Sequence, residues 1–121
     1  MATFNNNDEK LLKSIDTIFK RPGMFLYPIN IDSLDNFING YIMAMVSGTE
    51  QGRVDFFIEG NPSFNRWVVE KYHGEYLVMG WATAIKEHIS SDLGEINEGE
   101  DIQIFKTLLD EYVAMRRKQK E

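Results

Sequence analysis

The sequence predicts an all-α fold, a single compact domain of about five helices spanning residues 1–121, with a short strand or hairpin around residues 53–79 as the alternative. Apolar side chains recur at three- and four-residue spacing along most of the chain, which is typical of helices that bury one face. Helix stop signals, Pro22 and Gly74, follow two of these stretches. An apolar fraction of 43% in 121 residues is sufficient for one core without metal or disulfide support.

We expect the first helix from Asp8 to Lys20, because its apolar residues fall on one helical face: Leu11, Leu12, Ile15, Ile18 and Phe19. Asp8 and Glu9 lie in its first turn, where carboxylates interact favourably with the helix dipole. Residues 1–7 and 117–121 are expected to be frayed termini.

Residues 21–30 contain two prolines and one glycine, and this composition predicts an extended or turning connector. We expect its apolar side chains to enter the core: Met24, Phe25, Leu26 and Tyr27. Arg21 is expected to form a buried or half-buried charge-assisted hydrogen bond.

A second helix is expected from Asp32 to Ser47, with Asp32 and Asp35 at the spacing of a capping arrangement. Its predicted buried stripe consists of Leu34, Phe37, Ile38, Tyr41, Ile42 and Met45. Gly40 inside this helix costs roughly 1 kcal/mol relative to alanine, and the close crossing of another segment would explain it.

The middle of the chain allows two structures. Residues 54–58 fit a strand or one buried helical turn. Asn61 and Pro62 form a good helix start, and Gly74 can end that helix in left-handed geometry. Residues 66–80 also fit a β-hairpin that turns at His73 and Gly74.

Two further helices are expected, one near Gly80–Ser90 and the longest from about Glu98 to Lys118. The first would bury Trp81, Ala84, Ile85 and Ile89. The second would bury Ile102, Phe105, Leu108, Leu109, Tyr112 and Val113. Asn97 and Glu100 are placed to cap the long helix.

The composition limits the class of function. The chain contains no cysteine, which excludes disulfides, thiol nucleophiles and thiolate metal sites. No apolar run approaches the roughly 18 residues of a membrane helix, and residues 1–20 lack the order of a signal peptide. We therefore expect a cytoplasmic protein with no membrane partner.

The charge is uneven. The net charge is −6, and the last six residues carry four cations and one carboxylate, which leaves −9 on residues 1–115. An acidic body disfavours nucleic acid as a partner and favours association with a basic protein surface. A moderate negative charge also keeps a protein soluble, without any partner.

Motifs for catalysis are absent from the sequence. Neither His73 nor His88 has a partner at the spacing of a helical metal motif, and no glycine-rich phosphate cradle or nucleophile elbow occurs. We expect no metal, no cofactor and no catalytic residue, and hence no enzyme. Trp67 and Trp81 could line a ligand pocket, although aromatics at helical spacing are more often core residues.

Five carboxylates within ten residues form the candidate partner-binding site: Asp92, Glu95, Glu98, Glu100 and Asp101. They lack the spacing of a calcium loop. They fit either a solvated loop before a helix or an acidic patch that docks on a basic partner.

Four segments carry a resemblance to small, largely uncharacterised bacterial proteins. In those proteins an Arg-Pro-x-Met-Tyr-Leu-Gly stretch is followed by a Leu-x-x-Phe-Ile-x-Gly-Tyr helix, a Phe-x-x-Trp-Val segment and a later tryptophan. This chain supplies Arg21-Pro22-Gly23-Met24-Phe25-Leu26, Leu34-x-x-Phe37-Ile38-x-Gly40-Tyr41, Phe64-x-x-Trp67-Val68 and Trp81. It departs from the pattern at Tyr27-Pro28, where the pattern has glycine.

Proteins of this kind resemble immunity proteins from polymorphic-toxin and contact-dependent inhibition loci. The resemblance implies a protein that neutralises a cognate toxin by covering its active site. We expect a monomer or a weak homodimer. A nuclease fits the charge, since nuclease clefts are basic. The alternatives are a helical homo-oligomeric regulator or scaffold, and a small hydrolase or ligand-binding protein.

Overall fold

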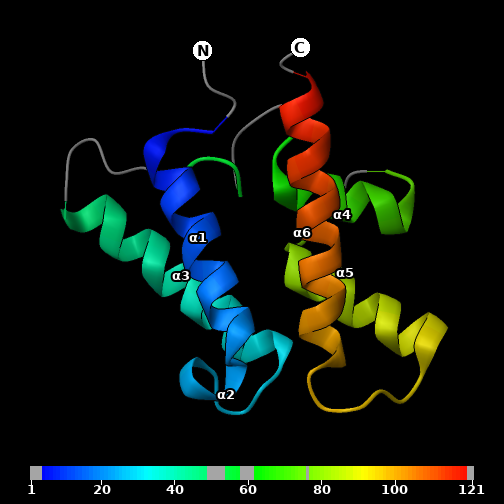
Figure 1. Ribbon diagram of the computed structural model, residues 1–121. Coiled ribbons are helices and arrows are strands. Elements are labelled where there is room, and N and C mark those ends of the chain that lie inside the picture. The colour runs from blue at the N-terminus through cyan, green and yellow to red at the C-terminus, as the bar shows by residue number, and fades with distance from the viewer. Residues whose placement is uncertain (1–3, 49–53, 58–61, 76, 120–121) are drawn as a thin grey trace.

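The fold is all-α. The computed structural model describes residues 4–48, 54–57, 62–75 and 77–119 (Figure 1). Its helices, in chain order, are α1 (Asn6–Lys20), α2 (Pro22–Phe25), α3 (Ile31–Gly48), α4 (Phe64–His73), α5 (Trp81–His88), the π-helix η1 (Ile89–Leu93) and α6 (Glu100–Gln119). No strand occurs among these described residues, so the predicted fold class is confirmed and the alternative strand or hairpin is not found there.

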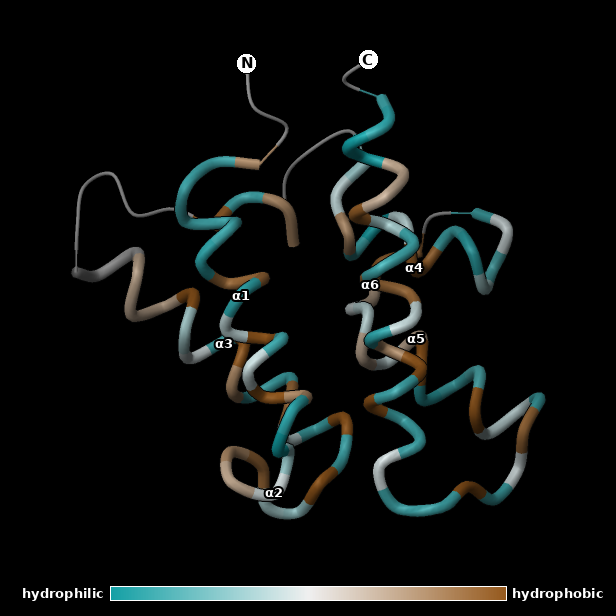
Figure 2. Tube along the Cα trace, viewed as in Figure 1, coloured by the Kyte–Doolittle hydropathy of each residue, from teal (hydrophilic) through white to brown (hydrophobic). Residues whose placement is uncertain are grey.

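The five predicted helices correspond to α1, α3, α4, α5 and α6, with small shifts at their ends. The long helix α6 packs against α3, α4 and α5. Hydrophobic and hydrophilic residues alternate at helical spacing along these elements (Figure 2). The predicted left-handed end of α4 is confirmed, since Gly74 has φ of 77°.

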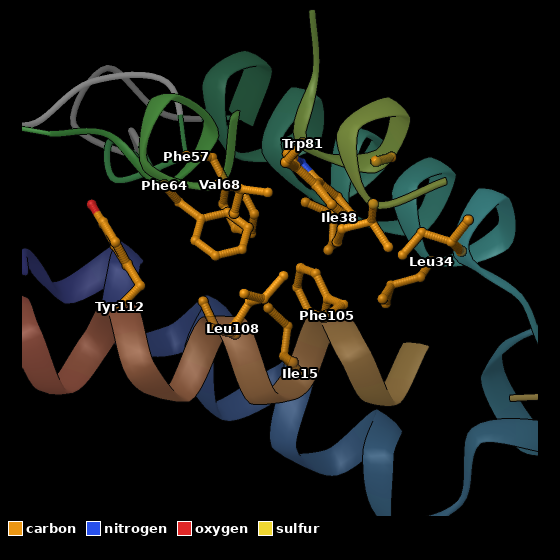
Figure 3. Close-up of a cluster of buried hydrophobic side chains, with 14 of the residues drawn as sticks. Ile15, Leu34, Ile38, Phe57, Phe64, Val68, Trp81, Phe105, Leu108 and Tyr112 are labelled. Atoms are coloured by element: carbon orange, nitrogen blue, oxygen red, sulfur yellow. The ribbon is translucent and has the colours of Figure 1, made fainter. Parts of the chain in front are cut away.

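An aromatic cluster forms the centre of the core (Figure 3). Phe64 of α4 is fully buried, and its ring lies 5.7 Å from that of Phe105 and 5.4 Å from that of Tyr112, both edge-on. Trp81 of α5 lies 4.8 Å from Phe105. Edge-to-face pairs at these separations add to the stabilisation from burial, so helices α4, α5 and α6 share one packed centre.

The α1 helix begins two residues earlier than predicted, because Asn5 and Asp8 cap it reciprocally. The Asn5 side chain accepts a hydrogen bond from the Asp8 amide at 2.7 Å, and the Asp8 carboxylate accepts one from the Asn5 amide at 3.0 Å. From its position in the sequence, Asp8 was expected in the first turn only as a partner of the helix dipole. Reading Asn5 and Asp8 together gives the capping box.

Asp8 is also the buried link between α1 and the segment 54–57. Its second carboxylate oxygen accepts hydrogen bonds from the amides of Asp55 at 2.8 Å and Phe56 at 3.4 Å, and the residue is only 3% exposed. Desolvation raises the pKa of Asp8 above its ordinary value of 3.8, although three backbone hydrogen bonds oppose the shift. The described part of the predicted strand or helical turn is therefore a turn that places Phe56 and Phe57 in the core.

The connector prediction was wrong for most of its side chains. Residues 22–25 form one helical turn, closed by a hydrogen bond from the Leu26 amide to the Pro22 carbonyl at 2.8 Å. This turn directs only Leu26 inward, at 2% exposure, and leaves Met24, Phe25 and Tyr27 exposed. Arg21 is also exposed rather than buried, and its Nη1 lies 3.9 Å from the Met24 sulfur.

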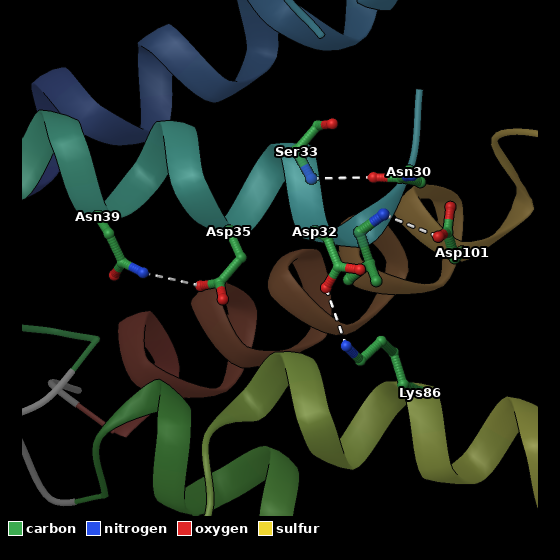
Figure 4. Close-up of polar contacts among 8 residues, drawn as sticks. Asn30, Asp32, Ser33, Asp35, Asn39, Lys86 and Asp101 are labelled. Carbon is green, nitrogen blue, oxygen red and sulfur yellow. Dashed lines mark hydrogen bonds and ion pairs between the residues drawn. The ribbon is translucent and has the colours of Figure 1, made fainter. Parts of the chain in front are cut away.

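The predicted cap of α3 was wrong as well. Asn30 accepts a hydrogen bond from the Ser33 amide at 2.9 Å, and Asp101 accepts one from the Ile31 amide at 2.7 Å (Figure 4). Asp32 instead pairs with Lys86 at 2.9 Å. The close crossing expected at Gly40 does not occur, because a Cβ built there would meet nothing within 4 Å.

Side-chain hydrogen bonds fix where α4 and α5 begin. Ser63 caps α4 by accepting a hydrogen bond from the Arg66 amide at 3.2 Å, so α4 begins after Ser63, whereas Asn61 lies outside the described residues. Asn65 accepts from the Trp81 amide at 2.7 Å and donates to the Met79 carbonyl at 3.2 Å. A side chain of α4 thus caps the first turn of α5.

The chain ends were expected to be frayed, yet the described residues next to them are tied to the fold. Asn6 and Asn7 belong to α1, and α6 continues to Gln119. Arg117 forms a two-pronged ion pair with Glu9, at 2.9 and 3.1 Å. This ion pair lowers the pKa of Glu9 below its ordinary value.

Replacing Asp8 with alanine tests the buried link. The change leaves the buried amide of Phe56 and the neighbouring Asp55 amide without their acceptor, so we expect the free energy of unfolding to fall by about 3 kcal/mol. Urea denaturation measures it. Glu9→Ala is the matched control on the same helix, where loss of an exposed ion pair costs less than about 1 kcal/mol. Equal losses in the two variants would contradict the role of Asp8.

The raised pKa of Asp8 predicts a pH dependence. Above its ordinary value of 3.8 the folded protein keeps a proton that the unfolded chain has released. The stabilisation that Asp8 contributes is therefore complete below that value and is lost as pH rises through the raised pKa. We expect the difference in unfolding free energy between wild type and Asp8→Asn to narrow as pH rises above the ordinary value of 3.8, as followed by urea denaturation. A difference that widens over this range would contradict the raised pKa.

Candidate functional site

The five carboxylates predicted as a partner-binding site fall into two groups. Glu95 and Glu98 lie in the exposed loop between η1 and α6, and Glu100 is exposed at the start of α6. Asp92 is exposed on η1 and contacts His88, with 2.8 Å between its Oδ2 and the ring Nδ1. Asp101 is half-buried and points into the fold.

Asp101 has a structural partner in α3. One of its oxygens accepts the hydrogen bond from the Ile31 amide, and the other accepts one from the amide of Ile102 at 2.8 Å. These bonds fix the first turn of α6 against the first turn of α3 (Figure 4). The structure therefore leaves Glu95, Glu98 and Glu100 exposed on the surface, whereas Asp101 is half-buried and bonded to the start of α3.

The loop that carries the acids is shaped by a glycine at each end. Gly94 has φ of 73° and Gly99 has φ of 86°, which is a backbone conformation that favours glycine. The amide of Gly94 donates to the Ile89 carbonyl at 2.8 Å and so closes the π-helix. The two glycines reverse the chain around Glu95 and Glu98.

Glu95 and Glu98 form no hydrogen bond or ion pair within the part of the chain that the structure describes. Glu100 accepts a hydrogen bond from the Asn97 side-chain amide at 2.7 Å, a contact between the two residues expected to cap α6. Its charge is not neutralised by a described cation. The loop therefore presents carboxylates whose charge is open to a partner.

A polar hollow of about 510 Å³ lies beside this region, lined by Tyr72, His73, Glu87, His88, Ser90, Ser91 and Asp92. The His88 ring stacks on Tyr72 with 4.3 Å between ring centres. His73 and Glu87 lie 3.4 Å apart across the hollow. Each histidine thus faces one carboxylate, and no group of three or more potential metal ligands gathers within the described ranges.

The tryptophans do not share a pocket among the described residues. Trp67 packs between Phe64 and Tyr112, with ring centres 6.4 and 5.7 Å away. Trp81 forms one wall of a separate hollow of about 230 Å³ that also includes Asp35, Asn39 and Thr83. Burial raises the pKa of Asp35.

One surface feature was not predicted from the sequence, the exposed apolar side chains of α2 and of Tyr27 just after it. Met24 is 68% and Tyr27 97% exposed. The signal was present, because Pro22 and Pro28 enclose a turn-forming segment, and such segments usually lie on the surface.

The comparisons with known proteins identify no family. No protein-family model matches the chain, and neither the curated proteins nor the solved structures contain a match. Among the described residues, no helix has the length and apolar character needed to cross a membrane.

The two groups of carboxylates are distinguished by their effect on stability. Asp101→Ala removes the acceptor for the first amide of α3, so we expect it to lower the free energy of unfolding by about 1 kcal/mol. Glu98→Ala, on the exposed loop, should change it by less than about 0.5 kcal/mol. Thermal and urea unfolding of both variants measure the difference. If Glu98→Ala proved the more destabilising, the assignment of these two carboxylates would be reversed.

Proposed function

We propose that this chain is a cytoplasmic immunity-type protein that binds a cognate bacterial toxin and occludes its active site. The observation that carries the proposal is the exposed, un-neutralised set of carboxylates Glu95, Glu98 and Glu100. The net charge of −6 gives the whole molecule the same sign.

The physics of association supports a basic protein as the partner. A patch of one charge sign attracts a surface of the opposite sign over a Debye length of about 8 Å at physiological ionic strength. It raises the association rate more than it raises affinity. A nuclease toxin presents such a basic surface, because its cleft must hold phosphates. An inhibitor that covers the cleft acts by excluding substrate.

Four segments resemble small, largely uncharacterised bacterial proteins, which in turn resemble immunity proteins, and this resemblance supports the same proposal. Two of those segments build the core, since Phe64 and Trp81 pack on α6.

A second candidate, a small hydrolase, is favoured by one observation, the contact between His88 and Asp92 in the polar hollow. A histidine held by a carboxylate can act as a general base. His88→Ala would abolish such an activity and would leave toxin neutralisation intact.

Growth rescue tests the proposed function directly. We expect co-expression of this chain with the C-terminal domain encoded by the adjacent reading frame to restore growth of cells that the domain alone arrests. A pull-down of the two proteins should recover a complex. Failure of both the rescue and the pull-down would remove the proposal.

Charge reversal tests the role of the acidic loop, which we define as residues 94–100, with Glu95, Glu98 and Glu100. Glu95→Lys/Glu98→Lys should lower the association rate with that toxin domain by at least about 10-fold at low ionic strength. Stopped-flow fluorescence over a range of salt concentrations measures the rate, and the difference should shrink as salt increases. Asp16→Lys/Glu75→Lys is the matched control with the same change in net charge on other surfaces, and we expect an effect of about twofold. Equal effects of the two pairs would assign the attraction to net charge alone.

A further inference from the structure

The α2 patch, which we define as Met24, Phe25 and Tyr27, gathers exposed apolar side chains within four residues. Their exposed fractions are 68%, 43% and 97%. Elsewhere in the described part of the chain, the exposed large apolar residues, Met43, Val78 and Leu93, are far apart in sequence. Scattered exposed apolar residues are ordinary, whereas a contiguous group marks an interaction surface.

The α2 patch and the acidic loop lie at the same end of the molecule (Figure 1). Ile29 joins them, because a Cβ built at Gly23 of α2 would lie 3.7 Å from its Cδ1, and one built at Gly99 of the loop would lie 3.8 Å from its Cγ2. The hydrogen bond from the Ile31 amide to Asp101 joins the starts of α3 and α6, which follow α2 and the loop in the chain. Figure 1 shows α2 and the loop before α6 at one end of the molecule, the end opposite the first turn of α1 and the last turn of α6.

The patch is held in place by the fold. Leu26 is 2% exposed and anchors the segment in the core. Pro22 occupies the first position of α2, where its fixed φ suits the helix. A surface that is already ordered loses little conformational entropy when a partner binds. Exposed apolar side chains on an anchored turn are therefore suited to act as binding anchors.

The charges around the patch indicate what covers it. Lys20 and Arg21 are exposed at the junction of α1 and α2, and Arg21 borders the patch through its contact with Met24. On the loop side stand the exposed carboxylates of Glu95, Glu98 and Glu100. Two copies of a chain with net charge −6 repel each other, whereas a basic protein is attracted to the loop side.

We propose that the α2 patch is the apolar centre of the toxin-docking face, with the acidic loop as part of its charged rim. The proposal rests on the proposed function. The partner is a protein whose surface places an apolar depression next to basic side chains. Interfaces of this type draw most of their binding energy from a few buried aromatic and methionine anchors, and the rim charges contribute mainly to the association rate.

The test is Met24→Ser/Tyr27→Ser, assayed against the same toxin domain by surface plasmon resonance. We expect Kd to rise at least about 30-fold, as for the loss of a central anchor, through faster dissociation. Met43→Ser/Val78→Ser is the matched control, because it removes a methionine and a second apolar side chain that are equally exposed on other elements. It should change Kd by less than about threefold. Circular dichroism and urea unfolding verify that both variants stay folded.

The outcomes separate the two proposals. If the wild-type chain does not bind the toxin domain, both the proposed function and the proposed docking face are overturned. If the wild-type chain binds and Met24→Ser/Tyr27→Ser binds equally well, only the docking face is overturned. A wild-type dimer in size-exclusion chromatography that Met24→Ser/Tyr27→Ser dissociates would assign the patch to a second copy and overturn the proposed partner.

Discussion

The buried carboxylate of Asp8 is the polar group on which the packing of the rest depends. A carboxylate loses hydration on burial and is tolerated only where hydrogen bonds replace the water. Here the start of α1 and the turn at residues 54–57 supply them. This turn places Phe56 and Phe57 beside the aromatic residues of α4 and α6. Tyr112 completes the link by donating to the Pro62 carbonyl at 2.8 Å. One side chain of the first helix thus determines how the middle of the chain reaches the last helix.

The helices were predictable because their causes are local. Apolar spacing and stop residues lie within a few positions of one another, and α1, α3, α4, α5 and α6 begin and end close to where the sequence placed them. Helix caps were less predictable. The first amide of α3 bonds to Asp101, 70 positions away, and that of α5 bonds to Asn65, 16 positions away. A pattern confined to neighbouring residues cannot identify such partners.

The candidate surface was predictable only in part, for a related reason. The sequence does not distinguish among the five carboxylates. Only the folded structure shows that Asp101 accepts a hydrogen bond from a distant backbone amide, that of Ile31. The apolar residues of α2 were assigned to the core because apolar side chains usually lie there. None of the residues of α2 is buried, and Leu26, which follows this helical turn, is the side chain that enters the core. The helical turn α2 instead leaves Met24 and Phe25 exposed on the surface.

The pairing of Glu9 with Arg117 has a practical consequence for work with this protein. It holds the first turn of α1 to the last turn of α6, at the end of the molecule that faces away from α2 (Figure 1). A tag or a tether attached beside the first turn of α1 or the last turn of α6 would therefore lie at the pole opposite α2 (Figure 1). Immobilised in this way, every molecule on a chip would present the same pole to the solution.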